Sequence, residues 1–174
     1  MTQTSNRLMN YFELFDIPIQ FVIDKKSIPK KYFELSRLYH PDLYVNASDE
    51  EKALMLEKTT MLNKAFKTFQ HSGDTLKYVL ELKGLLQKDE KYQLPASFLM
   101  EVMEINEAIT EGGATEETVN RIEQLETEIY EPVKEIVEGY QEGISSEKEL
   151  LQVKDYYFKK KYLDRIQQQL NGMT

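Results

Sequence analysis

Apolar residues recur every three or four positions along most of this 174-residue chain. Two stretches repeat the spacing four, three, four: Ile28, Tyr32, Leu35 and Tyr39, and Phe98, Val102, Ile105 and Ile109. Because an α-helix has 3.6 residues per turn, each set forms a stripe along one helix face. The chain also has only seven glycines, no tryptophan and 30% charged residues, a composition typical of helices. We therefore predict an all-α fold.

Prolines, glycines and capping residues divide the chain into helices. Ser27 is expected to cap the second helix and Pro41 to end it, while Pro132 is expected to kink a later one. The expected segments are Tyr11–Phe15, Ser27–Tyr39, Glu50–Gln70, Thr75–Leu85, Ala96–Glu111, Glu116–Glu142 and Ser146–Leu170. The short connections among the last three predict an antiparallel three-helix bundle.

Charge is distributed unevenly along the chain. Residues 89–150 hold 17 Asp and Glu against four Lys and Arg, while the segments on either side are slightly basic. We therefore expect two units with different partners: a first domain over residues 10–84, a linker over 85–94 and the helical bundle over 95–172. The acidic middle disfavours binding to nucleic acid.

The sequence contains no cysteine, which excludes disulfides, thiol catalysis and cysteine-ligated zinc or iron–sulfur sites in this chain. No metal and no cofactor is expected. No apolar run approaches the roughly 18 residues of a membrane span, and residues 1–10 lack the pattern of a targeting segment. A bacterial cytoplasmic protein that does not bind membranes is the simplest interpretation.

One tripeptide, His40-Pro41-Asp42, lies between two amphipathic helices. Pro41 stiffens the connection, and His40 and Asp42 supply an imidazole and a carboxylate that can bind across an interface. Two other interpretations stay open. The pair can simply cap a helix end, or it can be the acid–base pair of an enzyme, although no third polar group of an active site accompanies it.

The context of the tripeptide resembles a J-domain over about 70 residues. The resemblance rests on the short helix Tyr11–Phe15, the stripe ending in Tyr39, the loop after it, and Leu62-Asn63-Lys64-Ala65-Phe66 with Phe69. It implies two antiparallel helices joined by a His-Pro-Asp loop that docks on a DnaK-class chaperone and promotes ATP hydrolysis there. The chain itself would then be an ATPase activator and not an enzyme.

The same resemblance implies which residues contact the chaperone: His40, Pro41, Asp42, Lys30, Lys31 and Arg37. Lys30 and Arg37 lie opposite the apolar stripe on a helical wheel, with Lys31 at its flank, where they are free to meet an acidic surface. Each of them can also be an ordinary solvent-exposed cation. One position departs from the family pattern, because Leu43 follows the tripeptide where J-domains usually carry Lys or Arg.

The expected helix Ala96–Glu111 has a second apolar side. Leu99, Met100 and Met103 lie outside the Phe98–Ile109 stripe, among the acidic residues Glu104, Glu107 and Glu111. An exposed apolar cluster with an acidic rim is typical of a protein-binding surface. The face can instead pack against the rest of the chain or form a homodimer. Further on, Lys159, Lys160 and Lys161 are expected on a solvated face, and Tyr156, Tyr157, Phe158 and Tyr162 in the core, with Tyr162 a neighbour of the apolar cluster.

The whole chain is similar to the HscB-type iron–sulfur co-chaperones. An N-terminal J-domain opening with Tyr11-Phe12-Glu13-Leu14-Phe15 is followed, without a Gly/Phe-rich linker, by a bundle beginning Phe98-Leu99-Met100-Glu101. In that family the bundle binds the scaffold protein IscU and delivers it to the chaperone HscA. The implied scaffold contacts here are Leu99, Met100, Met103, Glu104, Glu107, Glu111 and Tyr162. Met103 and Tyr162 replace a leucine and a phenylalanine and preserve apolar character.

The leading hypothesis is therefore a co-chaperone that stimulates a DnaK/HscA-class ATPase and delivers an IscU-type scaffold protein to it. Two alternatives remain: a J-domain co-chaperone for a different client, and a non-catalytic helical adaptor in which the tripeptide is coincidental.

Overall fold

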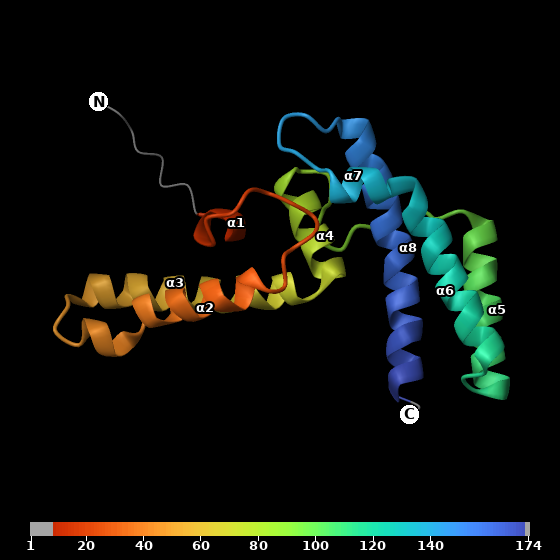
Figure 1. The fold of residues 1–174 in the computed structure, drawn as a ribbon, viewed down its shortest axis with the longest axis horizontal. Helices are drawn as coiled ribbons and strands as arrows, with labels where there is room; N and C mark the ends of the chain where they lie inside the picture. The colour runs from red at the N-terminus through yellow and green to blue at the C-terminus, as the bar shows by residue number, and fades with distance from the viewer. Residues whose placement is uncertain (1–8, 173–174) are drawn as a thin grey trace. The chain divides into compact units, whose positions relative to one another are not determined.

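The computed structural model describes residues 9–172, and within them the chain forms helices joined by turns, without a strand (Figure 1). The α-helices are α1 (Tyr11–Leu14), α2 (Ser27–Leu38), α3 (Asp49–Gln70), α4 (Ser72–Leu82), α5 (Ala96–Gly112), α6 (Glu116–Tyr130), α7 (Lys134–Glu138) and α8 (Glu147–Gly172). Two 3-10 helices, η1 (Pro41–Tyr44) and η2 (Glu131–Val133), lie between them. The predicted all-α fold is confirmed.

The chain divides into two compact units, with the boundary between Thr75 and Leu76. This boundary falls within α4, which begins three residues earlier than expected. The helix extends towards its N-terminus because the Thr75 hydroxyl donates to the carbonyls of Thr68 and His71, at 3.1 Å each. The predicted break over residues 71–73 is thereby reduced to a single non-helical residue, His71.

The first unit is a helical hairpin in which α2 packs against α3, and α1 packs against the far end of α3. Phe69 of α3 holds α1 in place, with its ring centroid 5.2 Å from Phe12 and 5.3 Å from Phe15. Capping boxes start both α1, at Asn10, and α3, at Ser48. These caps satisfy backbone N–H groups that would otherwise lack a partner.

Two expectations for α2 are wrong in detail. Ser27 does not cap the helix: it is the first helical residue, and its hydroxyl donates to the carbonyl of Asp24 at 3.3 Å. The apolar stripe is also buried only at Ile28, while Tyr32, Leu35 and Tyr39 are half-buried. In a hairpin of two helices, each helix covers only one side of the other. Apolar residues nearer the loop therefore stay partly in contact with solvent.

The second unit contains a three-helix bundle of α5, α6 and α8, as predicted. Its core holds the expected α5 stripe of Phe98, Val102, Ile105 and Ile109, together with residues from the partner helices, among them Ile122, Leu125, Val153, Leu163 and Ile166. Pro132 ends α6 at Tyr130 instead of kinking one long helix, and the chain continues through η2 into α7. Proline has no N–H for the helical ladder, so the α-helix stops there.

The segment before α5 is packed onto α8. Leu86 and Leu94 are buried, and the Tyr92 ring stacks on Phe158 with centroids 4.5 Å apart. The Tyr92 hydroxyl donates to Asp155 at 3.0 Å, and Glu90 pairs with Lys154 at 2.7 Å. This segment therefore lies along the surface of the bundle.

The buried stripe of α5 and the exposed residues beside it should contribute differently to the stability of the fold. Ile105→Ala removes a side chain with no exposed surface and should lower the free energy of unfolding by about 2–5 kcal/mol. Met100→Ala, at a position that is 62% exposed, should change it by no more than about 0.5 kcal/mol. Urea unfolding followed by circular dichroism measures both, and equal losses would contradict this division of α5 into a buried and an exposed side.

Candidate functional site

The connection between α2 and α3, residues 39–48, is the His-Pro-Asp loop. His40 precedes η1, and Pro41 occupies the first position of that 3-10 helix, where its missing N–H costs no hydrogen bond. The side chains of His40 and Asp42 are 57% and 87% exposed. The tripeptide therefore stands on the surface of the first unit and is accessible to a partner.

His40 and Asp42 face each other within the loop. The Nδ1 atom of His40 accepts the backbone N–H of Asp42 at 3.3 Å and lies 3.5 Å from the Asp42 carboxylate. A neutral imidazole makes the first contact, and a protonated one pairs with the carboxylate. His40 thus caps the start of η1, whereas the open interpretation was a pair that ends a helix, and this cap leaves both side chains exposed for a second role.

Contacts to both helices fix the loop. The Tyr44 hydroxyl donates to the carbonyl of Leu38 at 2.8 Å, and the Thr59 hydroxyl of α3 donates to the carbonyl of Tyr39 at 3.4 Å. The Lys58 ammonium group lies 5.3 Å from the centre of the Tyr39 ring. These contacts restrain the His-Pro-Asp loop, which lowers the entropy lost when a partner binds.

The predicted basic residues lie on α2. Lys30 and Arg37 are exposed and Lys31 is half-buried, in agreement with their positions on the helical wheel. Leu43, which follows the tripeptide, is 66% exposed and presents an apolar side chain beside the acid of Asp42. The hairpin therefore combines a polar loop with basic side chains on the preceding helix.

The second candidate site is on α5 in the other unit. Met100 and Met103 are 62% and 59% exposed, and Leu99 beside them is half-buried. We call Leu99, Met100 and Met103 the α5 patch. Glu104, Glu107 and Glu111 are all exposed along the following turns of α5, and Glu104 forms an ion pair with Arg121 of α6 at 3.3 Å. Within this unit, the patch is thus an exposed face with an acidic border.

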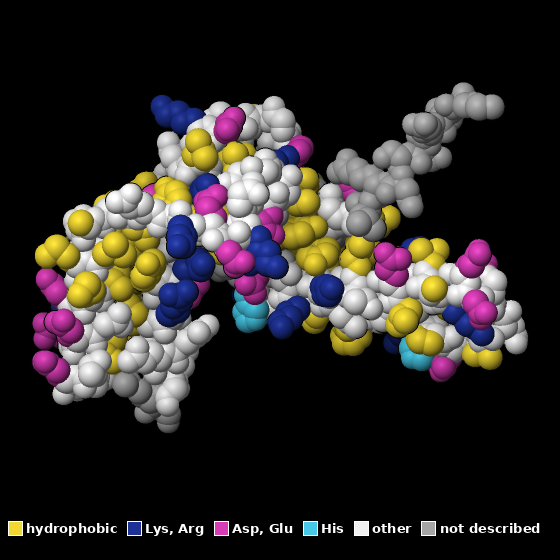
Figure 2. All heavy atoms as spheres, turned by 180° about the vertical axis from the view of Figure 1, so that it is seen from behind, with side chains coloured by type: hydrophobic (Ala, Val, Ile, Leu, Met, Phe, Trp, Pro, Cys, Tyr) yellow, Lys and Arg dark blue, Asp and Glu magenta, His cyan; other side chains and the backbone are white. Residues whose placement is uncertain are grey.

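Tyr162 of α8 lies next to the first turn of α5. It is 36% exposed, and its ring meets the ring of Phe98 edge-on with centroids 6.2 Å apart. Figure 2 shows apolar side chains gathered on the α5–α8 face of this unit, with acidic side chains along one edge and a row of Lys and Arg along the other. The apolar centre and the acidic edge agree with the sequence-based expectation, whereas the basic edge was not expected.

The contacts of Lys159 with the Phe98 ring and of Arg165 with the Tyr162 ring place cations of α8 at this basic edge, but the lysines of α8 are not the solvated group that was expected. Lys159 and Lys160 pair with Asp155 and Asp164, at 2.8 and 3.0 Å, and Lys161 is half-buried against aromatic rings. The i,i+4 spacing of the two pairs is visible in the sequence and could have indicated them. Tyr157 and Phe158 are buried as predicted, whereas Tyr156 is half-buried and Tyr162, also expected in the core, is exposed.

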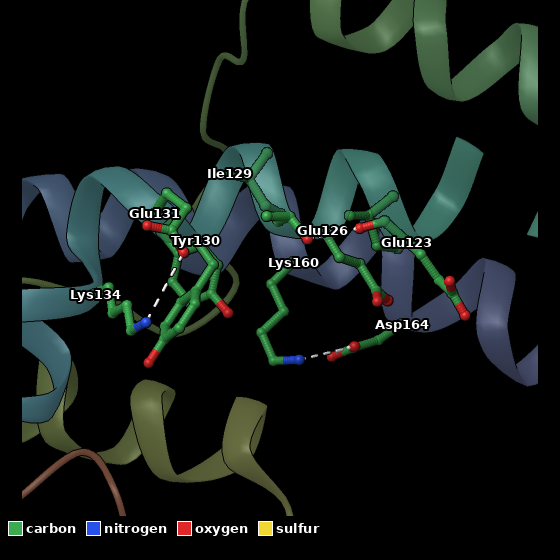
Figure 3. Close-up of a pocket in the computed structure, with 11 residues that line it drawn as sticks. Glu123, Glu126, Ile129, Tyr130, Glu131, Lys134, Lys160 and Asp164 are labelled. Atoms are coloured by element: carbon green, nitrogen blue, oxygen red, sulfur yellow. Dashed lines mark hydrogen bonds and ion pairs between the residues drawn. The ribbon is translucent and has the colours of Figure 1, made fainter. Parts of the chain in front are cut away.

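A hollow of about 490 Å³ lies between α6 and α8 (Figure 3). Tyr130 and Tyr156 line it, and burial, together with nearby acidic groups such as Glu138 beside Tyr130, raises the pKa of each to about 12. Both phenols are therefore protonated at neutral pH. Lys160 is paired with Asp164, and Lys134 lies 3.9 Å from Glu131. The hollow offers no ionised tyrosine for acid–base chemistry.

Among residues 9–172, no three His, Asp or Glu side chains come together as ligands for a metal ion. No helix there is long and apolar enough to cross a membrane.

Comparison with known proteins identifies the bundle and then the whole chain. A family model described as the HSCB C-terminal oligomerisation domain matches residues 94–171. A co-chaperone protein HscB homolog from Shewanella loihica is 33% identical over 165 residues, which cover 93% of this chain and 95% of the relative. The co-chaperone protein HscB of Buchnera aphidicola is 35% identical over 121 residues, 67% of this chain and 70% of the relative.

Solved structures agree with this result. The crystal structure of human co-chaperone protein HscB matches with a TM-score of 0.78 and 26% identity, covering 95% of this chain and 82% of that one. Chaperone HscB from Vibrio cholerae, at 24% identity, matches with a TM-score of 0.66 over 95% of this chain and 97% of that one, which supports the fold. The predicted architecture of a J-domain followed by a helical bundle is thereby confirmed. Because a relative one-third identical aligns over nearly the full length of both proteins, this chain belongs to the HscB family of co-chaperones.

Proposed function

We propose that this protein stimulates the ATPase of a DnaK/HscA-class chaperone and delivers an IscU-type iron–sulfur scaffold protein to it. The observation that carries the proposal is that one chain holds two exposed surfaces of different chemistry, the His-Pro-Asp loop in the first unit and the α5 patch in the second. Membership in the HscB family supports it.

The chaperone is contacted through the hairpin in this proposal. His40, Pro41 and Asp42 enter the interface, and Lys30, Lys31 and Arg37 steer the hairpin towards an acidic surface of the chaperone. The exposure of all these side chains except the half-buried Lys31, and the contacts that restrain the loop, support this role. The chemical step takes place in the active site of the chaperone, so His40 and Asp42 act as binding residues.

The scaffold protein is held by the bundle. The α5 patch and Tyr162 supply apolar contact, and flexible methionine side chains adapt to the shape of the partner. Glu104, Glu107 and Glu111 border the patch and select a partner with basic residues at the matching edge.

Joining the two binding surfaces on one chain gives the mechanism. A scaffold bound to the bundle is present near the chaperone at a high effective concentration. The hairpin meanwhile favours the conformation of the chaperone that follows ATP hydrolysis, in which clients are held tightly. In this proposal residues 10–84 form the J-domain, 85–94 the linker and 95–172 the scaffold-binding domain, and the protein acts in the bacterial cytoplasm.

A second copy of this chain is the other candidate occupant of the α5 patch. The matching family model is described as an oligomerisation domain, and the patch is apolar enough for self-association. Light scattering after size-exclusion chromatography distinguishes the two occupants. A dimer that Met103→Glu converts to a monomer would favour self-association, and a wild-type monomer leaves the patch free for the scaffold.

The role of the loop is tested with His40→Gln. Stimulation of ATP hydrolysis by the organism's DnaK-class chaperone should be lost, because Gln cannot replace the imidazole ring at the interface. Affinity for the scaffold protein should be unchanged, since the scaffold binds the other unit. His71→Gln is the matched control, because His71 is the other histidine of the chain and is also exposed. Loss of scaffold binding along with stimulation would contradict separate sites.

The role of the patch is tested by replacing Leu99, Met100 and Met103 together with Ala. Loss of about 1 kcal/mol of apolar contact per side chain should weaken binding of the scaffold roughly 100-fold, measured by calorimetry. Stimulation of the chaperone by the protein alone should persist. A control variant replaces three other apolar residues of the same unit that are 39%, 75% and 44% exposed: Leu82, Ile144 and Leu151. Scaffold affinity that survives the α5 changes would indicate another client.

A further inference from the structure

The basic edge of the α5–α8 face borders a hollow of about 280 Å³. Three cations line it: Lys161 and Arg165 of α8, and Lys91 of the segment that precedes α5. The hollow also contains one carboxylate, Glu90, which is already paired with Lys154 at 2.7 Å. We call this place the cationic hollow. Its three lining cations give it an excess of positive charge in a protein whose formal net charge is −8.

These cations differ from their neighbours on α8. Lys154, Lys159 and Lys160 each pair with a carboxylate of this chain at 2.7–3.0 Å. In the described range 9–172, by contrast, Lys91, Lys161 and Arg165 have no carboxylate within ion-pair distance. Their charges are therefore available to an anion from outside the chain.

Aromatic rings form the walls of the cationic hollow and hold two of the cations. The Lys161 ammonium lies 5.6 Å from the centres of both the Tyr157 and Phe158 rings, and the Arg165 guanidinium lies 5.8 Å from that of Tyr162. Such cation–π contacts restrain long side chains that would otherwise be mobile. A restrained pair of cations loses less entropy when it binds an anion.

The cationic hollow adjoins the proposed scaffold surface. Tyr162 lines the hollow, and the same ring contacts Phe98 in the turn of α5 that carries Leu99 and Met100. A protein that covers the α5 patch and Tyr162 therefore extends to the cationic hollow. Figure 2 shows the resulting order of acidic edge, apolar centre and basic edge on one face.

We propose that the cationic hollow binds a carboxylate side chain of the same client protein that covers the α5 patch. The inference rests on the proposed function and adds a second charged contact to it. The client would then carry basic residues facing Glu104, Glu107 and Glu111, apolar residues at its centre and an acidic residue facing Lys161 and Arg165. Opposite charges at two edges allow one orientation of the client and disfavour the reversed one.

The test compares two double variants in calorimetric binding to the IscU-type scaffold protein. Lys161→Gln with Arg165→Gln should weaken binding roughly 2- to 30-fold, as expected for loss of two partly exposed ion pairs. The matched control is Lys148→Gln with Lys160→Gln, which removes the same charge from α8 at side chains that line other hollows. Circular dichroism verifies that both variants fold, and both should stimulate the chaperone like the wild type when no scaffold is present.

Each other outcome overturns the inference in a distinguishable way. Wild-type affinity in Lys161→Gln/Arg165→Gln refutes the cationic hollow and leaves the proposed function standing. Equal weakening in the control variant indicates a general effect of net charge. Scaffold that fails to bind the wild-type protein refutes the proposed client and this inference together. Saturable binding of inorganic phosphate, followed by tyrosine fluorescence and lost in the variant while scaffold affinity is kept, would assign the hollow to a free anion.

Discussion

The burial of one stripe of α5 against α6 and α8 is the contact on which the second unit depends. Val102, Ile105 and Ile109 are at most 4% exposed, and they fix the rotation of α5 about its axis. Because a helix in a three-helix bundle buries one face only, the same rotation turns Met100 and Met103 outwards. The core and the candidate binding surface are therefore two consequences of one packing arrangement.

The first unit is constrained in a different way, since a two-helix hairpin cannot enclose all of its apolar residues. The rings of Phe12, Phe15 and Phe69 form a compact cluster at the end where α1 packs. Towards the His-Pro-Asp loop, the buried stripe gives way to half-buried and exposed side chains, including Leu43 at 66% exposure. Specific hydrogen bonds from Tyr44 and Thr59, in place of a deep core, hold the loop there.

Much of this was predictable, and the errors have local causes. The helices of the bundle were found because their apolar period is long and regular, and the predicted start of α5 at Ala96 agrees with the structure. Pro132 does interrupt the expected long helix, but α6 ends at Tyr130 instead of continuing with a kink. The proline lacks the N–H for the next helical hydrogen bond, and the chain turns into the 3-10 helix η2. Ser27 failed as a cap because its hydroxyl found the carbonyl of Asp24 instead of a helix N–H.

The sequence by itself determined the class of fold, the position of the His-Pro-Asp loop and the apolar and acidic residues of α5, because each of these follows from periodicity or from neighbours along one segment. Only the tertiary structure decided which cations form the basic edge of the α5–α8 face. Lys154 is neutralised by Glu90, and Tyr92 stacks on Phe158, across more than 60 positions of sequence. Which cations remain unpaired depends on contacts between segments that periodicity does not encode, so Lys161 and Arg165 stood out only once the chain was folded.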